Sequence, residues 1–372
     1  MRVNYYKPSV VFLPVALGLA LLAVVVGLLV APVGLVKAAT ITVTNTNDNG
    51  PGSLRQAIAD AAPGDTIEFN LTYPATITLD SQFQITKALT INGPGLDKLA
   101  ISGNNITRTF FISVTNGTAV TLTRMTIRDG HADSGGGMAS FTATLTLSDT
   151  AIVSNTTALG GGGIAVVGGT NVLNEVQIRN NRAYVGGGIA FGSSGSMTLN
   201  GGQITSNTAF NGGGGGMYIW GDTTLNGVKL IGNSANQGGG IYALWHKQPN
   251  RVTLNETHLF DNSAKFDGAA IYVMEVEQPH HFTVTNSCIV NNYISSASTP
   301  SGFAVKVYSG IIQGATNNWW GAANGPSGIG PGNGDSVSED IAYLPFKTSA
   351  PSGCLERNIT KKTYVPLILK NP

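Results

Sequence analysis

The stretch Val252-Thr253-Leu254-Asn255-Glu256-Thr257-His258-Leu259 alternates apolar and polar residues on both sides of a short polar break. Alternation with period two is typical of β-strands, so the stretch predicts two strands joined by a corner. Its first leucine belongs to a column of aliphatic residues spaced 25 to 30 apart: Leu122, Leu147, Leu173, Leu199, Leu225, Leu254 and Val284. Its second leucine belongs to a column five residues later: Ile127, Ile152, Ile178, Ile204, Leu230, Leu259 and Ile289.

Two polar features recur with the same spacing. An asparagine follows the second column by three residues, at Asn155, Asn181, Asn207, Asn233, Asn262 and Asn292. Such amides can hydrogen-bond from layer to layer when they stack. Glycine runs such as Gly186-Gly187-Gly188-Ile189 then lead into a third strand. Three strands and three corners per repeat predict an all-β, single-stranded parallel β-helix of about ten coils.

An open stack of strands has two edges that must be covered. The segment from Ser53 to Ala61 places apolar residues at 54, 57, 58 and 61 behind a serine suited to capping a helix. We therefore expect a short helix that closes the first coil.

The ends of the repeat carry a resemblance to a known family. The segment Thr44–Ile58 and the motif Leu89-Thr90-Ile91-Asn92-Gly93-Pro94-Gly95 resemble the opening of bacterial surface proteins named for a Ser-Leu-Arg-Glu-Ala motif, with Gln56 in place of Glu. The repeats are similar to those of polymorphic outer-membrane proteins. Among them, Gly268-Ala269-Ala270-Ile271 most resembles the repeat motif of that family. The resemblance implies a right-handed β-helix of the pectin-lyase-like fold, exported to the bacterial envelope.

The segment Asn317-Asn318-Trp319-Trp320-Gly321 is similar to the closing coil of many right-handed parallel β-helix proteins. Because Asn318 lies 26 residues after Asn292, we expect it to continue the asparagine column.

Three regions are expected. Residues 1–39 combine a basic start with a long uncharged run, so they predict either a cleaved signal peptide or an uncleaved membrane anchor. Residues 40–346 form the β-helix domain, and residues 347–372 form a linker and a tail that is either a sorting tag or a last docked strand. The net charge of +1 argues against a nucleic-acid partner, and the membrane is a partner only through an uncleaved N-terminal segment.

The two cysteines, Cys288 on an outward strand position and Cys354 after the last coil, predict either one disulfide in an exported protein or two unrelated thiols. Their spacing does not fit a metal knuckle, and the histidines His246, His258, His280 and His281 show no ligand spacing. The sequence therefore predicts no metal site and no cofactor.

Catalysis would need converging carboxylates. Asp149 and Glu175 fall at equivalent positions of adjacent repeats, about 4.8 Å apart if the layers stack. Asp129, His131 and Asp133 form a second acidic cluster at a glycine corner. Both sets of residues fit solvated surface positions at least as well as they fit the roles of general acid and base in a catalytic site.

The third strands carry an aromatic column. Tyr218, Tyr242 and Tyr272 should point outward from three successive layers. Trp220 and Trp245 lie at or next to outward-facing positions of the same strands. Rings at strand spacing could form a platform for sugar rings, or they could only stack on one another. The sequence therefore favours an exported, non-catalytic β-helix for adhesion or carbohydrate binding, whose partner is a polysaccharide or another cell surface. The alternative is a polysaccharide lyase or glycoside hydrolase.

Overall fold

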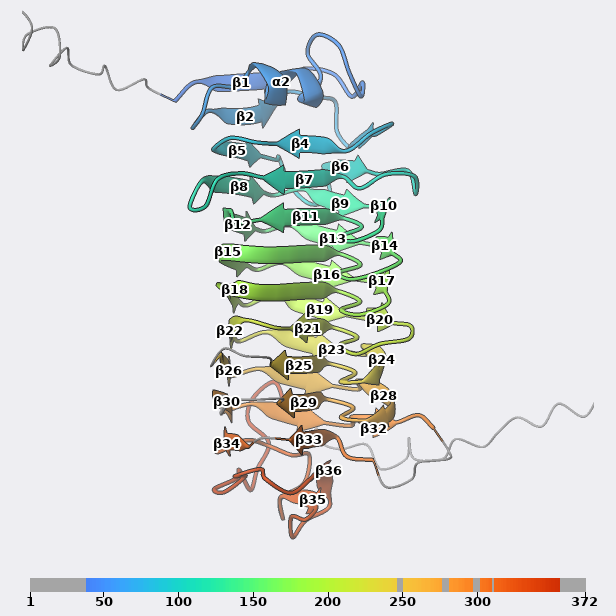
Figure 1. Cartoon of the computed structure of the whole chain (residues 1–372), viewed down its shortest axis with the longest axis vertical. Coiled ribbons are helices and arrows are strands. Elements are labelled where there is room, and N and C mark those ends of the chain that lie inside the picture. The colour runs from blue at the N-terminus through green and yellow to red at the C-terminus, as the bar shows by residue number, and fades with distance from the viewer. Residues whose placement is uncertain (1–37, 246–249, 276–280, 297–301, 310, 355–372) are drawn as a thin grey trace, which may run out of the picture. The chain divides into compact units, whose positions relative to one another are not determined.

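The computed structural model describes residues 38–245, 250–275, 281–296, 302–309 and 311–354. The described residues from Ala39 to Cys354 form one compact unit in which short parallel strands stack in successive layers (Figure 1). The segment predicted as a signal peptide or anchor lies, apart from its last two residues, outside the described part, and so does the tail after residue 354. No helix among the described residues has the length and apolar character needed to cross a membrane.

The coils contribute strands to three parallel sheets, and among the described residues the third, sheet C, has strands only between His131 and Ile294. Sheet A contains β1 (Thr40–Val43), β2 (Thr66–Phe69), β4 (Phe83–Ile85), β5 (Leu89–Asn92), β7 (Phe110–Ser113), β8 (Ala119–Thr123), β11 (Met138–Phe141), β12 (Thr144–Ser148), β15 (Ile164–Asn174), β18 (Ile189–Asn200), β21 (Met217–Ile219), β22 (Asp222–Asn226), β25 (Ile241–Trp245), β26 (Arg251–Asn255), β29 (Ile271–Glu275), β30 (His281–Thr285), β33 (Val305–Ser309), β34 (Ile312–Gly314), β35 (Pro326–Gly328) and β36 (Gly334–Val337). Sheet B contains β3 (Ala75–Thr78), β6 (Leu99–Ser102), β9 (Thr126–Arg128), β13 (Ala151–Val153), β16 (Gln177–Arg179), β19 (Gln203–Thr205), β23 (Lys229–Ile231), β27 (His258–Phe260) and β31 (Cys288–Val290). Sheet C contains β10 (His131–Ala132), β14 (Thr156–Thr157), β17 (Arg182–Ala183), β20 (Thr208–Ala209), β24 (Ser234–Gln237), β28 (Ser263–Asp267) and β32 (Tyr293–Ile294).

The register confirms both aliphatic columns. Leu122 pairs with Leu147, and the pairing continues through every layer to Val284 in sheet A. Ile127 starts the matching series in sheet B, which ends at Ile289. All of these side chains are buried, so the repeat places one layer of hydrophobic core inside each coil.

The corners explain why polar residues recur beside the columns. Between sheets A and B, seven successive coils have a left-handed residue at the same position: Arg124, Asp149, Glu175, Gly201, Gly227, Glu256 and Asn286 have φ of 53°, 46°, 50°, 64°, 65°, 51° and 53°. Between sheets B and C, left-handed residues such as Ser154 and Asn180 precede the asparagine column. A residue with a left-handed backbone turns the chain sharply between two strands. Its recurrence is explained by the geometry of the corner and does not indicate a catalytic role.

The asparagine column forms a continuous buried ladder. Asn207 represents it: its Oδ1 accepts hydrogen bonds from the backbone N and the Nδ2 of Asn181, at 3.0 and 2.9 Å, and its Nδ2 donates to Asn233 Oδ1 at 3.0 Å. The ladder runs from Asn155 to Asn292, which confirms the stacked amides.

The expectation that Asn318 continues this ladder is wrong. The carboxylate of Asp335 accepts hydrogen bonds from the backbone N and Nδ2 of Asn292, at 2.9 and 2.8 Å, and so ends the ladder. Asn318 instead accepts from the backbone N of Ser287 at 2.8 Å, at the corner between sheets A and B.

The predicted cap is confirmed. Helix α2 (Leu54–Asp60) begins after Ser53, whose side chain accepts a hydrogen bond from the backbone N of Gln56, and it buries Leu54, Ala57 and Ile58. It lies at one end of the stack, and β35 and β36 lie at the other end (Figure 1). Trp320 is fully buried beneath the closing segment.

Candidate functional site

A cavity of about 420 Å³ opens at the corner between sheets C and A. Its lining residues are neutral, and they combine aromatic rings, carboxamides and glycine backbone: Val185, Asn211, Gly212, Gly213, Tyr218, Asn236, Gln237, Tyr242 and Phe266. The volume falls within the range of small-molecule sites, about 300–1,000 Å³. We take this cavity as the candidate site.

A longer loop creates the cavity. Six residues separate Asn207 from Gly214, whereas four separate Asn181 from Gly186 in the preceding coil. The extra residues are held from both sides, because Gly212 N donates to Tyr184 O at 2.8 Å and Asn236 Nδ2 donates to Asn211 O at 2.9 Å. Gly213 forms part of the wall, and a Cβ added there would overlap the ring of Tyr242.

The aromatic column stacks ring on ring. The centroids of Tyr218 and Tyr242 are 5.3 Å apart with planes 8° apart, and those of Tyr242 and Tyr272 are 5.1 Å and 18° apart. Tyr308 adds a further ring at 6.4 Å from Tyr272. The column starts at Tyr218 because the residue paired with it in the preceding strand is Ala190.

The structure corrects the expected exposure of this platform. Tyr242 and Tyr272 are only 9% and 4% exposed, because the rings cover one another and the corner packs against them. Tyr218 and Tyr242 line the cavity, whereas Tyr272 and the exposed Trp220 do not. The side chain of Trp245 lies outside the described part of the chain. The role of these five aromatic residues in ligand binding stays a prediction.

The phenol groups of Tyr218, Tyr242 and Tyr272 are held neutral. Burial, and then the neighbouring Tyr242, raise the pKa of Tyr218 to about 12. Burial also raises the pKa of Tyr242 and of Tyr272. Their hydroxyls therefore act as hydrogen-bond donors and acceptors over the whole physiological pH range.

Sequence reasoning missed Asn211, Asn236, Gln237 and Phe266. The extra loop length was visible in the sequence. It did not reveal that the side-chain amides of neighbouring coils would line the same cavity. Tyr308 was missed for another reason: the pairing of β29 with β33 shifts register after Val273, and this breaks the repeat.

The first acidic pair has a structural role. Asp149 and Glu175 are exposed and occupy left-handed corner positions in successive coils. Glu175 Oε2 accepts a hydrogen bond from Gly202 N at 3.1 Å. Neither residue lines the cavity, and as an acid and base pair they stay a prediction.

The second acidic cluster is equally peripheral to the cavity. Asp129 is a left-handed corner residue whose Oδ2 pairs with Arg128 Nη1 at 2.7 Å. His131 and Asp133 are exposed on and just after β10, and none of the three lines the cavity.

Cys288 faces away from the core of the coil, yet it is only 1% exposed. Trp319, Ala350 and Cys354 pack over it together with Phe260 and Val290. The structure joins Cys288 and Cys354 in a disulfide with Cα atoms 5.8 Å apart, a normal separation for such a bond.

Residues 95–235 match the model of a protein family described as the right handed beta helix region. No match was found among curated proteins or among solved structures. The matched stretch includes the longer loop and the start of the tyrosine column, although the asparagine ladder and the column continue past it. The chain is thus an all-β, right-handed parallel β-helix of about ten coils.

Proposed function

We propose that this protein is exported and that its β-helix binds neutral carbohydrate at the cell surface without cleaving it. The observation that carries the proposal is the composition of the cavity: aromatic rings, three carboxamides and no charged residue among its lining. Sugars present C–H faces that pack on aromatic rings and hydroxyls that pair with amides, so this lining suits a neutral sugar.

The lack of acidic or basic groups in the lining favours binding over turnover. A hydrolase needs two carboxylates across one cleft, and a calcium-assisted lyase needs several carboxylates and a base. The acidic residues singled out from the sequence lie elsewhere, and three of them, Asp129, Asp149 and Glu175, occupy left-handed corner positions.

The proposed location rests on the ends of the chain. Residues 1–39 have the charge and hydropathy pattern of an export segment, and Thr44–Ile58 resembles the opening of bacterial surface proteins with the Ser-Leu-Arg-Glu-Ala motif. A binding module displayed outside the cell would serve adhesion to a polysaccharide or to another cell, as in polymorphic outer-membrane proteins and their relatives.

Replacing Tyr218 with alanine should weaken carbohydrate retention about tenfold, because the change removes a ring from the cavity wall, an interaction of about 0.5–1.5 kcal/mol. Tyr308→Ala is the matched control, since it removes a ring from the opposite end of the same stack, where the side chain is 66% exposed and does not line the cavity. Retention is measured by affinity electrophoresis on neutral polysaccharides, with melting temperatures recorded for both variants. Equal retention by Tyr218→Ala and the native protein would remove the cavity from the proposal.

The same incubations, with calcium and with chelator, are assayed for released reducing ends and unsaturated sugars. We expect no release. Release would contradict the non-catalytic proposal and direct attention to Asp149 and Glu175.

A further inference from the structure

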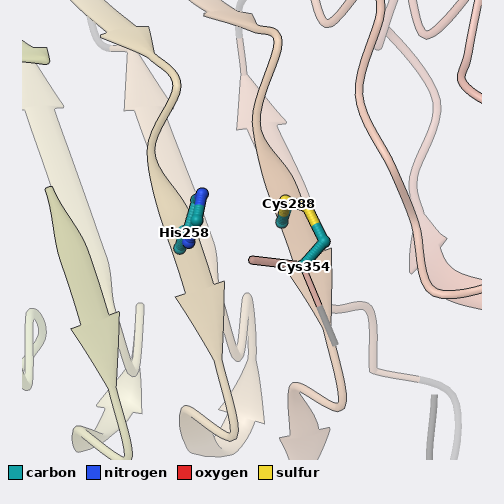
Figure 2. A group of neighbouring side chains, drawn as sticks. All are labelled: His258, Cys288 and Cys354. Carbon is teal, nitrogen blue, oxygen red and sulfur yellow. A yellow bond between two sulfur atoms is a disulfide. The ribbon is translucent and has the colours of Figure 1, made fainter. Parts of the chain in front are cut away.

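A histidine lies beside the disulfide. His258 is the first residue of β27, and its partner in the next layer of sheet B is Cys288, the first residue of β31. Potential ligand atoms of His258, Cys288 and Cys354 all lie within 4.8 Å of one another. Figure 2 shows the two residues on adjacent strands, with Cys354 reaching Cys288 from the closing segment. Among the described residues this is the only group of three or more histidine, cysteine or acidic side chains so close together.

The imidazole is placed as a ligand would be. His258 Nδ1 is buried and has no hydrogen-bond partner, which is an uncommon state for a buried polar atom. A Cβ built at Gly353 would lie 3.6 Å from His258 Cε1, so the segment that carries Cys354 contacts the ring.

The surroundings would shield a metal from water. Phe260, Val290 and Trp319 form an apolar wall around Cys288, with Ile231 and Ala350 packed against it. The wall comes from sheet B and the closing segment, so it exists independently of the bond between the two sulfur atoms. Two sulfur ligands and one nitrogen ligand are the donor set of a tetrahedral zinc site with one open position.

We propose that the Cys288–Cys354 disulfide is the oxidised form of a Cys₂His zinc site that His258 completes. An external dithiol opens the site: it gives two electrons and two protons to the disulfide, two thiols form, and the dithiol becomes a disulfide itself. Zn²⁺ then displaces the two thiol protons and binds both thiolates and one imidazole nitrogen of His258. Typical zinc bonds of about 2.3 Å to sulfur and 2.1 Å to nitrogen place tetrahedral ligands about 3.6 Å apart. After reduction the two sulfur atoms therefore separate from the roughly 2 Å of a disulfide, and the ligand atoms, which now lie within 4.8 Å of one another, need to move only a short way.

The spacing of the three residues explains why the sequence did not reveal them. Cys288 and Cys354 are 66 residues apart, and His258 is one coil before Cys288. In a coil of this length, neighbours in space are about 30 residues apart in the chain, so short metal-binding motifs are absent. The proposal therefore departs from the expectation that the histidines, His258 among them, show no ligand spacing.

The test uses the full-length protein, reduced with dithiothreitol under argon and freed of reductant by gel filtration. Zn²⁺ alone is added, and bound zinc is counted by native mass spectrometry and elemental analysis. Co²⁺ replaces zinc in parallel, because thiolate-to-cobalt charge transfer reports the sulfur ligands. We expect one zinc per reduced chain, none in the oxidised chain, and a rise in the melting temperature of the reduced protein when zinc binds.

Two variants separate a metal site from a plain disulfide. His258→Ala should weaken zinc binding at least tenfold, and Cys288→Ser should abolish it. His281→Ala is the matched control, because His281 is exposed and its Nδ1 contacts Gln313 at 2.5 Å, away from the cluster. The proposal is overturned if reduced native protein binds no more zinc than Cys288→Ser, if His258→Ala binds as tightly as the native chain, or if reduction unfolds the β-helix.

Discussion

Asn207→Leu is expected to lower the free energy of unfolding by about 3–5 kcal/mol, since about 1–3 kcal/mol is lost for each buried polar group left without a partner. Leucine has the same number and branching of side-chain heavy atoms as asparagine, so the substitution leaves no cavity and removes the hydrogen bonds. The backbone N of Asn181 loses its acceptor, and Ile178 O loses the donor that lies 2.9 Å away. Urea denaturation followed by circular dichroism measures the change.

Asn200→Leu is the matched control for this prediction. Asn200 forms a second amide row on the outside of the same coil: its Nδ2 donates to Asn174 Oδ1 at 3.0 Å, and its Oδ1 accepts from Asn226 Nδ2 at 3.0 Å. These side chains are half-buried, and water replaces the lost partners, so the expected loss is within about 1 kcal/mol. Equal losses for the two variants would show that the inner ladder does not hold the coils together.

Gly215→Ala should destabilise the β-helix by about 3 kcal/mol, at the upper end of the usual cost of overpacking. A Cβ at this position would overlap the carbonyl oxygens of Ser234 and Gly239, which belong to the backbone of the next coil. Backbone cannot rotate away as a side chain can, so the coils must separate locally. The measurement is again the urea midpoint.

Gly192→Ala serves as the control for a glycine that has room. A Cβ there would lie 3.5 Å from Val166 O and 3.6 Å from Val167 Cγ2, which are ordinary contacts. The stability of this variant should stay within about 1 kcal/mol of the native value. If Gly215→Ala unfolds at the same urea concentration as Gly192→Ala, successive coils do not approach each other at Gly215 as closely as the structure indicates.

The sequence predicted the fold well because parallel, in-register coils repeat their chemistry. Leu225 sits between Leu199 and Leu254 in the structure as it does in the sequence column, and the same holds for the amides of the ladder. Each layer provides the same environment to its neighbours, so one residue type recurs at each position. The helix at Leu54 was visible because it carries its own cap and apolar face.

The errors arose where the repeat is interrupted. Asn318 is 26 residues after Asn292, but the closing coil has its own path, and the residue that Asn318 contacts, Ser287, is 31 positions earlier. The outward direction of Tyr242 followed from strand alternation, whereas its burial depends on contacts with Gly213 and the neighbouring rings. Contacts between coils at loops of unequal length are tertiary, and no local pattern encodes them.

The lining of the cavity likewise combines residues that the repeat predicted with residues that only the contacts between coils reveal. Tyr218 was predicted as a ligand-binding residue from its column, but the amides of Asn236 and Gln237 became candidates only once the coils were stacked. The acidic candidates Asp149 and Glu175 lie at left-handed corner positions of adjacent coils, a backbone feature that the alternation of apolar and polar residues did not predict.

The most direct test of the central claim is a crystal structure of the protein soaked with an oligosaccharide from the polysaccharide that it retains best. The account predicts a sugar ring packed against Tyr218, with hydroxyls paired to the amides of Asn236 or Gln237. An oligosaccharide bound across the exposed corners at Asp149 and Glu175, with the cavity empty, would contradict it.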